Sequence, residues 1–489
     1  MRKCFLAALA FLVSLPAAAA DNVVTYHNSI FRTGAYKVPT LTLANAANIH
    51  LDTSFKPVVT GNIYAQPLFY EASGSPHGIV IVATESNSVY ALDAGSGKTI
   101  WKAQLPASAP LSELQCGNIN PEGITGTPVI DPVAGVLYLD ALVKTSNGPR
   151  QKIYALLLTN GSVVASWPLD VQAAMASAGV SFLSTTQGAR SALLLLNGNL
   201  YVVYGGRYGD CGTYHGTVIQ IQTQPPKLLA NWQTRANGGG IWAQGGIAGD
   251  GESLFVTTGN TMGASTWMDG EAIIRLSPGL ARSTNTKDYF TPSNWQNLDD
   301  SDEDLGGTEA LPISIAVAGS EPVKRVIAFG KDGNAYLTNR PNLGGVGGAI
   351  QVFAASSGAI RTAPAVYQTS SATMVAYTNS GNSRCSGSNE AMLNVAASGS
   401  SPMSFAWCES LNGAGAPIVT TTDGASNGIV WVLGAEGDNE LHGFNALTGA
   451  TAFSGTGTSM SGLHHFQTIL ATRHRFYVAG DNEVYSFEF

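Results

Sequence analysis

Apolar residues along the chain come in short runs, separated by turns rich in Gly, Asn and Asp. The stretch 84–105, "TESNSVYALDAGSGKTIWKAQL", has an extended run, a reversal at Asp93–Gly97 and a second run that carries Trp101 four residues after the last turn glycine. Runs of this length, bounded by turn residues, are typical of β-strands and too short for most helices. The pattern therefore predicts an all-β protein.

The same strand–turn–strand unit returns along the chain. Trp167 follows the Asn160-Gly161 turn, and Phe453 lies four residues after Gly449. Each unit is preceded by a small residue or a proline that opens an apolar run. These opening residues are Pro67, Pro128, Ala192, Gly246, Ala310, Pro364, Pro417 and Thr468. Their spacing of about 51 to 64 residues fits four short strands, which is one blade of a β-propeller.

The last unit is cut short, because the 21 residues after Thr468 suffice for three strands but not four. The run 50–61, "HLDTSFKPVVTG", precedes the first unit and supplies the missing outer strand. We therefore expect an eight-bladed β-propeller over residues 48–489, closed by pairing of this N-terminal strand with the C-terminal blade. The aromatic residue after each turn should fill the wedge between neighbouring blades.

The first 47 residues lie outside this repeat. Residues 1–20 have Arg2 and Lys3, an apolar centre and an Ala-rich end, which predicts a secretory signal peptide cleaved after Ala20. Cys4 is not at a cleavage site, so no lipid anchor is expected. The mature protein should be periplasmic or secreted. For the polar arm 21–47, two interpretations stay open: a lid over one face, or a disordered segment.

Composition excludes several classes of partner. The chain has 33 acidic against 25 basic residues, a formal net charge of −8, which argues against nucleic acid and anionic lipid. No apolar run after the signal peptide is long enough to cross a bilayer. No nucleophile elbow, phosphate loop or His-Glu-x-x-His motif is present. We expect a monomer that binds a small polar molecule or a protein partner.

Four cysteines remain after processing: Cys116, Cys211, Cys385 and Cys408. An even number in an oxidising compartment predicts two disulfides, for which three connectivities are possible. Cys385 and Cys408 flank a polar segment and are placed to staple two neighbouring strands. There is no Cys-x-x-Cys-His motif, so no covalently attached c-type haem is expected.

The repeat "VYALDAGSGKTIWKAQL" resembles the signature of the PQQ-like (quinoprotein alcohol dehydrogenase-like) eight-bladed β-propellers. The segments "GNIYAQPLFYEA", "GITGTPVIDP", "GIWAQGGIAGDGESLFVTTGNT", "DEDLGG" and "GKDGNAYLTNRPNLGG" follow in the order seen in exported bacterial members. The resemblance covers nearly the whole mature chain. It implies the fold, but not one activity, because this fold carries both dehydrogenases and scaffolds without a cofactor.

A dehydrogenase of this kind would bind the quinone PQQ and calcium at the centre of the ring. The resemblance then implies Trp242, in "GGGIWAQGGI", as the indole floor below the quinone, and Asn260, in "TTGNT", as a calcium ligand. Lys331 would contact the quinone oxygens. Asp302 or Asp304, in "LDDSDEDLGG", would be the catalytic base.

The sequence also departs from the dehydrogenases. The family's adjacent cysteine pair is reduced to Cys116 alone in "LQCGNINPEG". The family's calcium-binding Glu is missing from "GGRYGDCGTYHG", where Cys211 stands in its place and Asp210 could substitute. This alignment implies a Cys116–Cys211 bridge that would cross and block the pocket, with Cys385–Cys408 as the second disulfide.

The starts of the innermost strands give a further set of candidates, since they face one mouth of a propeller. They are Gln66, Thr127, Arg190, Gln244, Glu309, Arg361 and Gln467. Among these, Gln66, Arg190 and Gln244 are candidate ligand-binding residues. Structural interpretations also stand: Trp242 as a plug of the channel, Asn260 as a turn residue and Lys331 as a solvated side chain.

Two functions follow from the residues. The first is an exported PQQ-like propeller that binds a ligand or a partner, as a module or scaffold, with a degenerate quinone site. The second is a PQQ- and calcium-dependent dehydrogenase that oxidises an alcohol, an aldose or a polyol. A role in membrane assembly, as in a related lipid-anchored propeller, is disfavoured by the absence of a lipidation cysteine.

Overall fold

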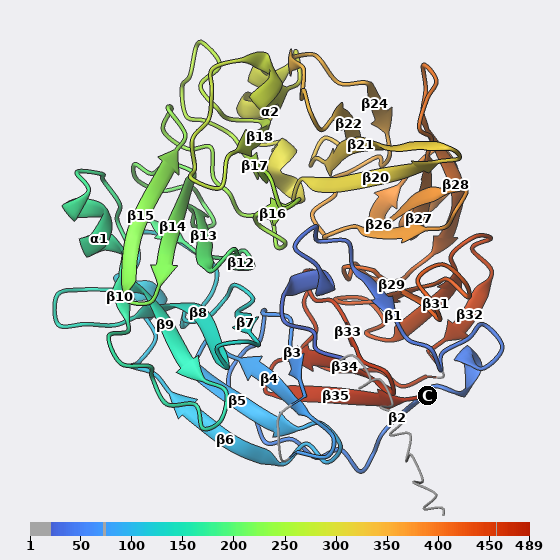
Figure 1. Ribbon diagram of the computed structural model, residues 1–489, viewed down its shortest axis with the longest axis horizontal. Helices are drawn as coiled ribbons and strands as arrows, with labels where there is room; N and C mark the ends of the chain where they lie inside the picture. The colour runs from blue at the N-terminus through green and yellow to red at the C-terminus, as the bar shows by residue number, and fades with distance from the viewer. Residues whose placement is uncertain (1–20, 72–74, 456) are drawn as a thin grey trace, which may run out of the picture.

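The computed structural model describes residues 21–71, 75–455 and 457–489, and it forms a ring of eight radially arranged sheets (Figure 1). The predicted eight-bladed β-propeller is therefore confirmed. Each innermost strand begins one or two residues after an opening residue that the sequence pattern singled out. Strand β3, for example, starts at Leu68 after Pro67, and β29 starts at Ile418 after Pro417.

The first four blades contain these strands. The first blade has β3 (Leu68–Tyr70), β4 (Ile79–Ala83), β5 (Ser88–Asp93) and β6 (Thr99–Gln104), and the second has β7 (Val129–Asp131), β8 (Val136–Val143), β9 (Arg150–Leu157) and β10 (Leu169–Asp170). The third has β12 (Leu194–Leu196), β13 (Asn199–Gly206), β14 (Thr217–Thr223) and β15 (Pro226–Gln233), with β11 (Gln187–Gly188) beside β13. The fourth has β16 (Ala248–Gly249), β17 (Leu254–Thr258), β18 (Ala272–Leu276) and β19 (Tyr289–Thr291), with β23 (Gly345–Val346) beside β19.

The other four blades complete the ring. The fifth blade has β20 (Leu311–Val317), β21 (Ser320–Phe329), β22 (Asn334–Asn339) and β24 (Gln351–Ala354), and the sixth has β25 (Ala365–Gln368), β26 (Thr373–Gly381), β27 (Ser386–Val395) and β28 (Met403–Ser410). The seventh has β29 (Ile418–Thr421), β30 (Ile429–Leu433), β31 (Leu441–Asn445) and β32 (Thr451–Ser454), with β1 (Ala35–Lys37) beside β29. The eighth has β33 (Leu470–Ala471), β34 (Arg475–Gly480), β35 (Glu483–Glu488) and β2 (His50–Leu51). The helical elements are α1 (Val171–Ser177), α2 (Trp295–Ser301), η1 (Tyr26–Asn28), η2 (Ala46–Asn48), η3 (Leu111–Glu113), η4 (Thr286–Asp288) and η5 (Leu305–Gly307).

Strand β2 closes the ring as the outer strand of the last blade. His50 lies opposite Glu488 and Leu51 opposite Phe487, in an antiparallel ladder. The closing strand is thus confirmed, but it is much shorter than the predicted run 50–61. The reason is local: the Asp52 side chain accepts a hydrogen bond from the Ser54 backbone N–H at 2.8 Å, which turns the chain away from the sheet.

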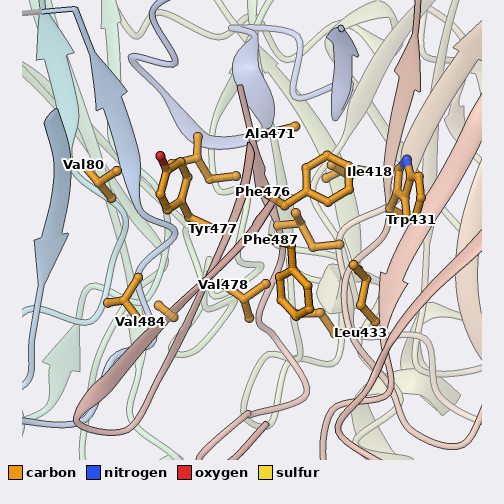
Figure 2. Close-up of a cluster of buried hydrophobic side chains, with 14 of the residues drawn as sticks. Val80, Ile418, Trp431, Leu433, Ala471, Phe476, Tyr477, Val478, Val484 and Phe487 are labelled. Atoms are coloured by element: carbon orange, nitrogen blue, oxygen red, sulfur yellow. The ribbon is translucent and has the colours of Figure 1, made fainter. Parts of the chain in front are cut away.

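Apolar packing stabilises this closure. Figure 2 shows Val80 of the first blade, Trp431 of the seventh and Phe476 of the eighth in one buried cluster. Trp431 and Phe476 lie edge to face, with ring centres 5.0 Å apart. Because the closing ladder is only two residues long, apolar packing between side chains of three blades adds to the stability of the joint.

The aromatic residue after each turn has the expected role between blades. Trp101 on β6 donates its indole N–H to the Leu158 carbonyl of the next blade at 2.8 Å, and its ring lies over Gly161. A Cβ at Gly161 would come within 2.5 Å of that ring. Trp407 on β28 repeats the contact, donating to the Ala446 carbonyl at 2.9 Å and packing on Gly449.

The N-terminal arm is neither disordered nor a lid over one face. It enters the centre of the ring, where β1 pairs in parallel with the innermost strand β29 (Figure 1). Tyr26 packs against the alanines that precede or open three innermost strands, Ala192, Ala363 and Ala416. The fully buried Arg32 reaches the Ile247 and Leu193 carbonyls at 3.1 and 3.0 Å. The arm therefore plugs the channel that the eight sheets enclose.

The predicted signal peptide, residues 1–20, lies outside the described residues. Within the described part of the chain, no helix has both the length and the apolar character that a membrane crossing requires.

Candidate functional site

A cavity of about 570 Å³ opens at the centre of the ring, on the side where loops of blades three to five gather. Its lining includes Trp242, Asn260 and Lys331, together with both candidate acids, Asp302 and Asp304. Arg190 lines the same cavity. Six of the eight residues singled out from the sequence are therefore brought together. Their chemical roles stay predictions.

Gln66 and Gln244 are not among the lining residues. Gln66 is buried, and its side-chain carbonyl accepts the His27 backbone N–H of the arm at 3.0 Å. The Gln244 amide donates to the Tyr64 carbonyl at 3.2 Å. Both glutamines are used within the protein, Gln66 to hold the arm that occupies the channel.

Trp242 is placed by glycines. It follows the glycine-rich segment 238–240 between β15 and β16, and Gly259 lies against it just after β17. A Cβ at Gly259 would stand 3.2 Å from the indole nitrogen and 2.4 Å from a carboxylate oxygen of Asp304. Only glycine therefore lets Trp242 and Asp304 approach each other. The Lys331 ammonium lies over the indole ring, 5.3 Å from its centre, as in a cation–π contact.

Asp304 is the best-held acid of the cavity. It is only 3 % exposed, and one carboxylate oxygen accepts the Asn260 backbone N–H at 2.7 Å. Its other oxygen contacts the Lys331 ammonium. The Asp304 carbonyl also accepts the Lys331 backbone N–H at 2.9 Å. Both carboxylate oxygens of Asp304 therefore already have a donor from the protein.

Asp302 binds the same lysine. It ends α2 in the left-handed region, with φ of 55°, and this turn directs its carboxylate to the Lys331 ammonium at 2.9 Å. Burial opposes the charged form of Lys331, but the carboxylates of Asp304 and Asp302 outweigh it and raise the pKa of the ammonium. Lys331 is therefore a fixed cation between two acids and not a solvated side chain.

Two further acids adjoin this network. Burial raises the pKa of Asp210, which accepts the Tyr214 hydroxyl at 2.6 Å. Glu271 is fully buried, and burial, together with the charge of Asp304, raises its pKa well above the ordinary value. Its carboxyl accepts the Leu305 N–H at 2.5 Å and so holds the loop that carries Asp304. Sequence reasoning missed Glu271, because nothing in its surroundings, "DGEAII", marks it as more than a strand edge.

Three arginines face the cavity in different states. Arg207 is buried and lies 2.9 Å from the Glu122 carboxylate. Arg190 donates to the Asn118 amide oxygen at 3.1 Å, and Arg361 is exposed. Within the described part of the chain, neither Arg190 nor Arg361 has a carboxylate within ion-pair distance. These two guanidinium groups are therefore available to an anion that enters the cavity.

Both implied disulfides are present, Cys116–Cys211 and Cys385–Cys408. Cys116–Cys211 joins two loops at the rim of the cavity, and the lining includes Asn118 on one loop and Gly209 on the other. The cysteines themselves are not part of the lining. The hypothesis that this bridge blocks the pocket is therefore wrong, because the space of about 570 Å³ remains beside it.

The residues present fit a flat anion better than they fit a calcium ion. Calcium takes six to eight oxygen ligands, several of them from carboxylates. Here both oxygens of Asp304 are taken by protein donors, and Asp302 is paired with Lys331. Across the residues described, no group of three His, Cys, Asp or Glu side chains is arranged to hold a metal ion. Trp242, in contrast, offers a surface for stacking, and Arg190 and Arg361 offer cations for an anion.

Comparisons with known proteins bear on the fold. No family model matches the chain, and no curated protein matches it by sequence. Among solved structures, the quinohemoprotein alcohol dehydrogenase of Comamonas testosteroni aligns with a TM-score of 0.64 at 15 % identity, covering 96 % of this chain and 80 % of that one. A europium-containing methanol dehydrogenase aligns with a TM-score of 0.64 at 13 % identity, covering 94 % and 89 %.

A third neighbour, BamB of Moraxella catarrhalis, aligns with a TM-score of 0.51 at 13 % identity, covering 90 % of this chain and all of that one. These structural alignments establish the fold, but sequence identities this low leave the activity open. The neighbours include proteins named as dehydrogenases and one that is not. The chain has the PQQ-like, quinoprotein-type eight-bladed β-propeller fold.

Proposed function

We propose that this chain is an exported PQQ-like propeller that serves as a binding module, holding a small, flat anion in the cavity above Trp242. The observation that carries the proposal is the state of Lys331. Its ammonium lies over the indole and between two carboxylates, so both acids that would hold calcium or abstract a proton are already bound to a cation of the protein. Export is supported by the two disulfides, which persist in oxidising compartments.

The charges of the cavity support an anion. Asp302 and Asp304 share Lys331, and Glu122 pairs with Arg207. The lining has four cationic side chains against three acids, Asp210, Asp302 and Asp304. Arg190 and Arg361 are the cations of this lining that have no carboxylate within ion-pair distance in the described structure. A guanidinium group recognises a carboxylate through two parallel hydrogen bonds, and an indole contributes a flat apolar surface. A small aromatic carboxylate matches both features.

The test uses the purified mature chain and two probes, PQQ and 2,6-naphthalenedicarboxylate, with tryptophan fluorescence as the signal. We expect both probes to bind with and without EDTA, and to bind about tenfold to a hundredfold more weakly to Arg190→Gln and Arg361→Gln, since one charge-assisted hydrogen bond is worth about 1.5–3 kcal/mol. Arg384→Gln is the matched control, because this guanidinium lies over Phe405 and is not part of the cavity lining. If neither probe binds, the proposal of a binding module is rejected.

A calcium-dependent dehydrogenase is the second candidate. It is favoured by the convergence of Trp242, Asn260, Lys331 and Asp304 in one cavity. This function requires PQQ- and calcium-dependent reduction of a dye by an alcohol, an aldose or a polyol. Turnover that is abolished by EDTA and by Asp304→Asn would replace the binding module with the enzyme.

A further inference from the structure

A histidine at the rim of the main cavity has no part in the proposed function so far. His465 lies in the loop between β32 and β33, and its side chain is 36 % exposed. Together with Arg361 it lines the main cavity and a smaller chamber of about 230 Å³ beside it. His464, the next residue in the chain, lines neither of these two spaces. Protonation of His465 therefore changes the charge of the cavity lining itself.

The His465 ring is held from outside the cavity by Glu436, in the loop between β30 and β31. One carboxylate oxygen of Glu436 lies 2.8 Å from Nδ1 of His465 and also accepts the His465 backbone N–H at 3.3 Å. A carboxylate only accepts hydrogen bonds, so Nδ1 carries a proton. Glu436 has a φ of 59°, which is uncommon for a non-glycine residue, and its N–H donates to the Asn439 side chain at 3.1 Å. This turn fixes the carboxylate and, through it, the ring.

The other ring nitrogen of His465, Nε2, is free. It has no hydrogen-bond partner among the described residues, and it is not one of their buried unpartnered atoms. Because Nδ1 carries the proton of the neutral ring, Nε2 then presents a lone pair, which repels an anion. The protonated ring presents an N–H at Nε2, which attracts an anion. Imidazole side chains ordinarily make this change between pH 5 and 8.

Other charged groups surround this pair. His464 lies 2.9 Å from Asp481 and 4.0 Å from Glu436, and Arg361 shares both linings with His465. Burial raises the pKa of Asp210, so the gain of a proton there would act on an anion in the same direction as at His465. The charged residues of the main lining, besides Arg361, are Arg190, Arg207, Asp210, Asp302, Asp304 and Lys331.

We propose that His465 regulates the anion site of the main cavity by pH: the imidazolium is a further cation for the bound anion, beside Arg190 and Arg361, and the neutral ring favours release. The inference rests on the proposed function and adds how that site is regulated. One proton at His465 removes one negative charge from the Glu436–His465 pair and creates a donor at Nε2, so anion affinity rises as pH falls. Since the ring is partly exposed, we expect a gain of about threefold to tenfold, the worth of one net hydrogen bond.

The test is calorimetric titration of the mature chain with 2,6-naphthalenedisulfonate at pH 5.5, 6.5 and 8. Both sulfonates stay ionised over this range, so the probe itself does not titrate. We expect Kd to be about threefold to tenfold lower at pH 5.5 than at pH 8, and His465→Gln to reduce this ratio below about twofold. His464→Gln is the matched control and should leave the ratio unchanged, because that ring lies outside the lining.

Proton uptake gives a second measurement. At pH 6.5, titrations in two buffers of different ionisation enthalpy should show that the wild type takes up protons when the probe binds. His465→Gln should take up fewer protons, and His464→Gln as many as the wild type. A role of His465 in folding alone would not produce this difference.

Three results would overturn the inference. One is the same Kd for the wild type at pH 5.5 and pH 8. Another is an equal gain at low pH in His465→Gln and the wild type, which would assign the effect to a different group such as Asp210. The last is the absence of disulfonate binding at all three pH values. The proposed function is judged by its own two probes, so binding that does not depend on pH rejects this inference and leaves the binding module in place.

Discussion

Replacing Arg32 by methionine tests whether the arm is an integral part of the ring. The guanidinium is fully buried and donates to the Ile247 and Leu193 carbonyls and to the Thr25 hydroxyl, the last at 2.6 Å. Methionine keeps much of the volume but removes the charge and all of these bonds. Loss of one partner from such a buried charged network costs about 3–5 kcal/mol.

The same arginine acts on Glu309. That carboxyl is fully buried and neither oxygen has a hydrogen-bond partner in the described structure. Burial raises the pKa of Glu309 to about 7, and the positive charge of Arg32 partly opposes that rise. At pH 8 the Arg32→Met change should therefore cost less in a Glu309→Gln background than in the wild type. We expect a coupling energy of about 0.5–3 kcal/mol, because the two buried groups interact through their charges.

Thermal and urea unfolding of the mature chain measure both effects. An unfolding entropy of about 2.1 cal/mol/K per residue gives about 1 kcal/mol/K for a chain of this length, so Arg32→Met should lower Tm by about 3–5 °C. Arg384→Met, at an exposed guanidinium that lies over Phe405, is the control and should change stability by less than about 1 kcal/mol. A loss below about 1 kcal/mol for Arg32→Met, or no coupling to Glu309, would refute the view that the arm is anchored through this residue.

Three further predictions concern stability. Burial raises the pKa of Glu85 to about 8 and that of Asp140 to about 7, so the folded protein binds protons that the unfolded chain has lost. The Tm should therefore fall as pH rises from about 4.5 to 8, and Glu85→Gln should flatten that slope. A Tm that rises over this range would contradict the assignment of these raised pKa values. Removing the Cys116–Cys211 bridge, which spans 95 residues, should lower the free energy of unfolding more than removing Cys385–Cys408, which spans 23. Loop entropy gives about 5 against about 3 kcal/mol, to be measured by unfolding of the paired Ser variants. The reverse order would contradict the loop-entropy argument. Trp101→Ala should cost about 3–5 kcal/mol in urea unfolding, since the indole fills the space between two blades, and a loss below about 1 kcal/mol would show that the wedge is not needed.

The blade count was predictable because it depends on local signals. A proline or small residue opens each unit, a glycine turn divides it, and the period repeats eight times along the chain. The same logic located the closing strand. Its length was overestimated, because the Asp52 turn that ends it is a side-chain hydrogen bond and not a change in hydrophobic pattern.

The place of the arm could not be predicted. Arg32 binds backbone carbonyls of Ile247 and Leu193, 215 and 161 residues away, and a backbone acceptor leaves no signature in the sequence. Gln66 was expected at an open mouth for the same reason: only the folded arm shows that its side chain is used by His27.

The candidate site was predictable in its members but not in their pairing. The resemblance placed Trp242, Asn260, Lys331 and Asp304 correctly in one cavity. Whether Lys331 faces a ligand or neutralises Asp304 depends on side-chain geometry, which no motif encodes. The buried Glu271 escaped notice because its role is to hold the Asp304 loop through a backbone N–H.

Calorimetric titration of the mature chain with CaCl₂, in the presence of PQQ, tests most directly the claim that Lys331 binds the two acids that would otherwise hold calcium. The structure predicts no saturable calcium binding at concentrations up to the millimolar range, and unchanged PQQ affinity in EDTA. Stoichiometric calcium binding that disappears in Asp304→Asn would contradict it.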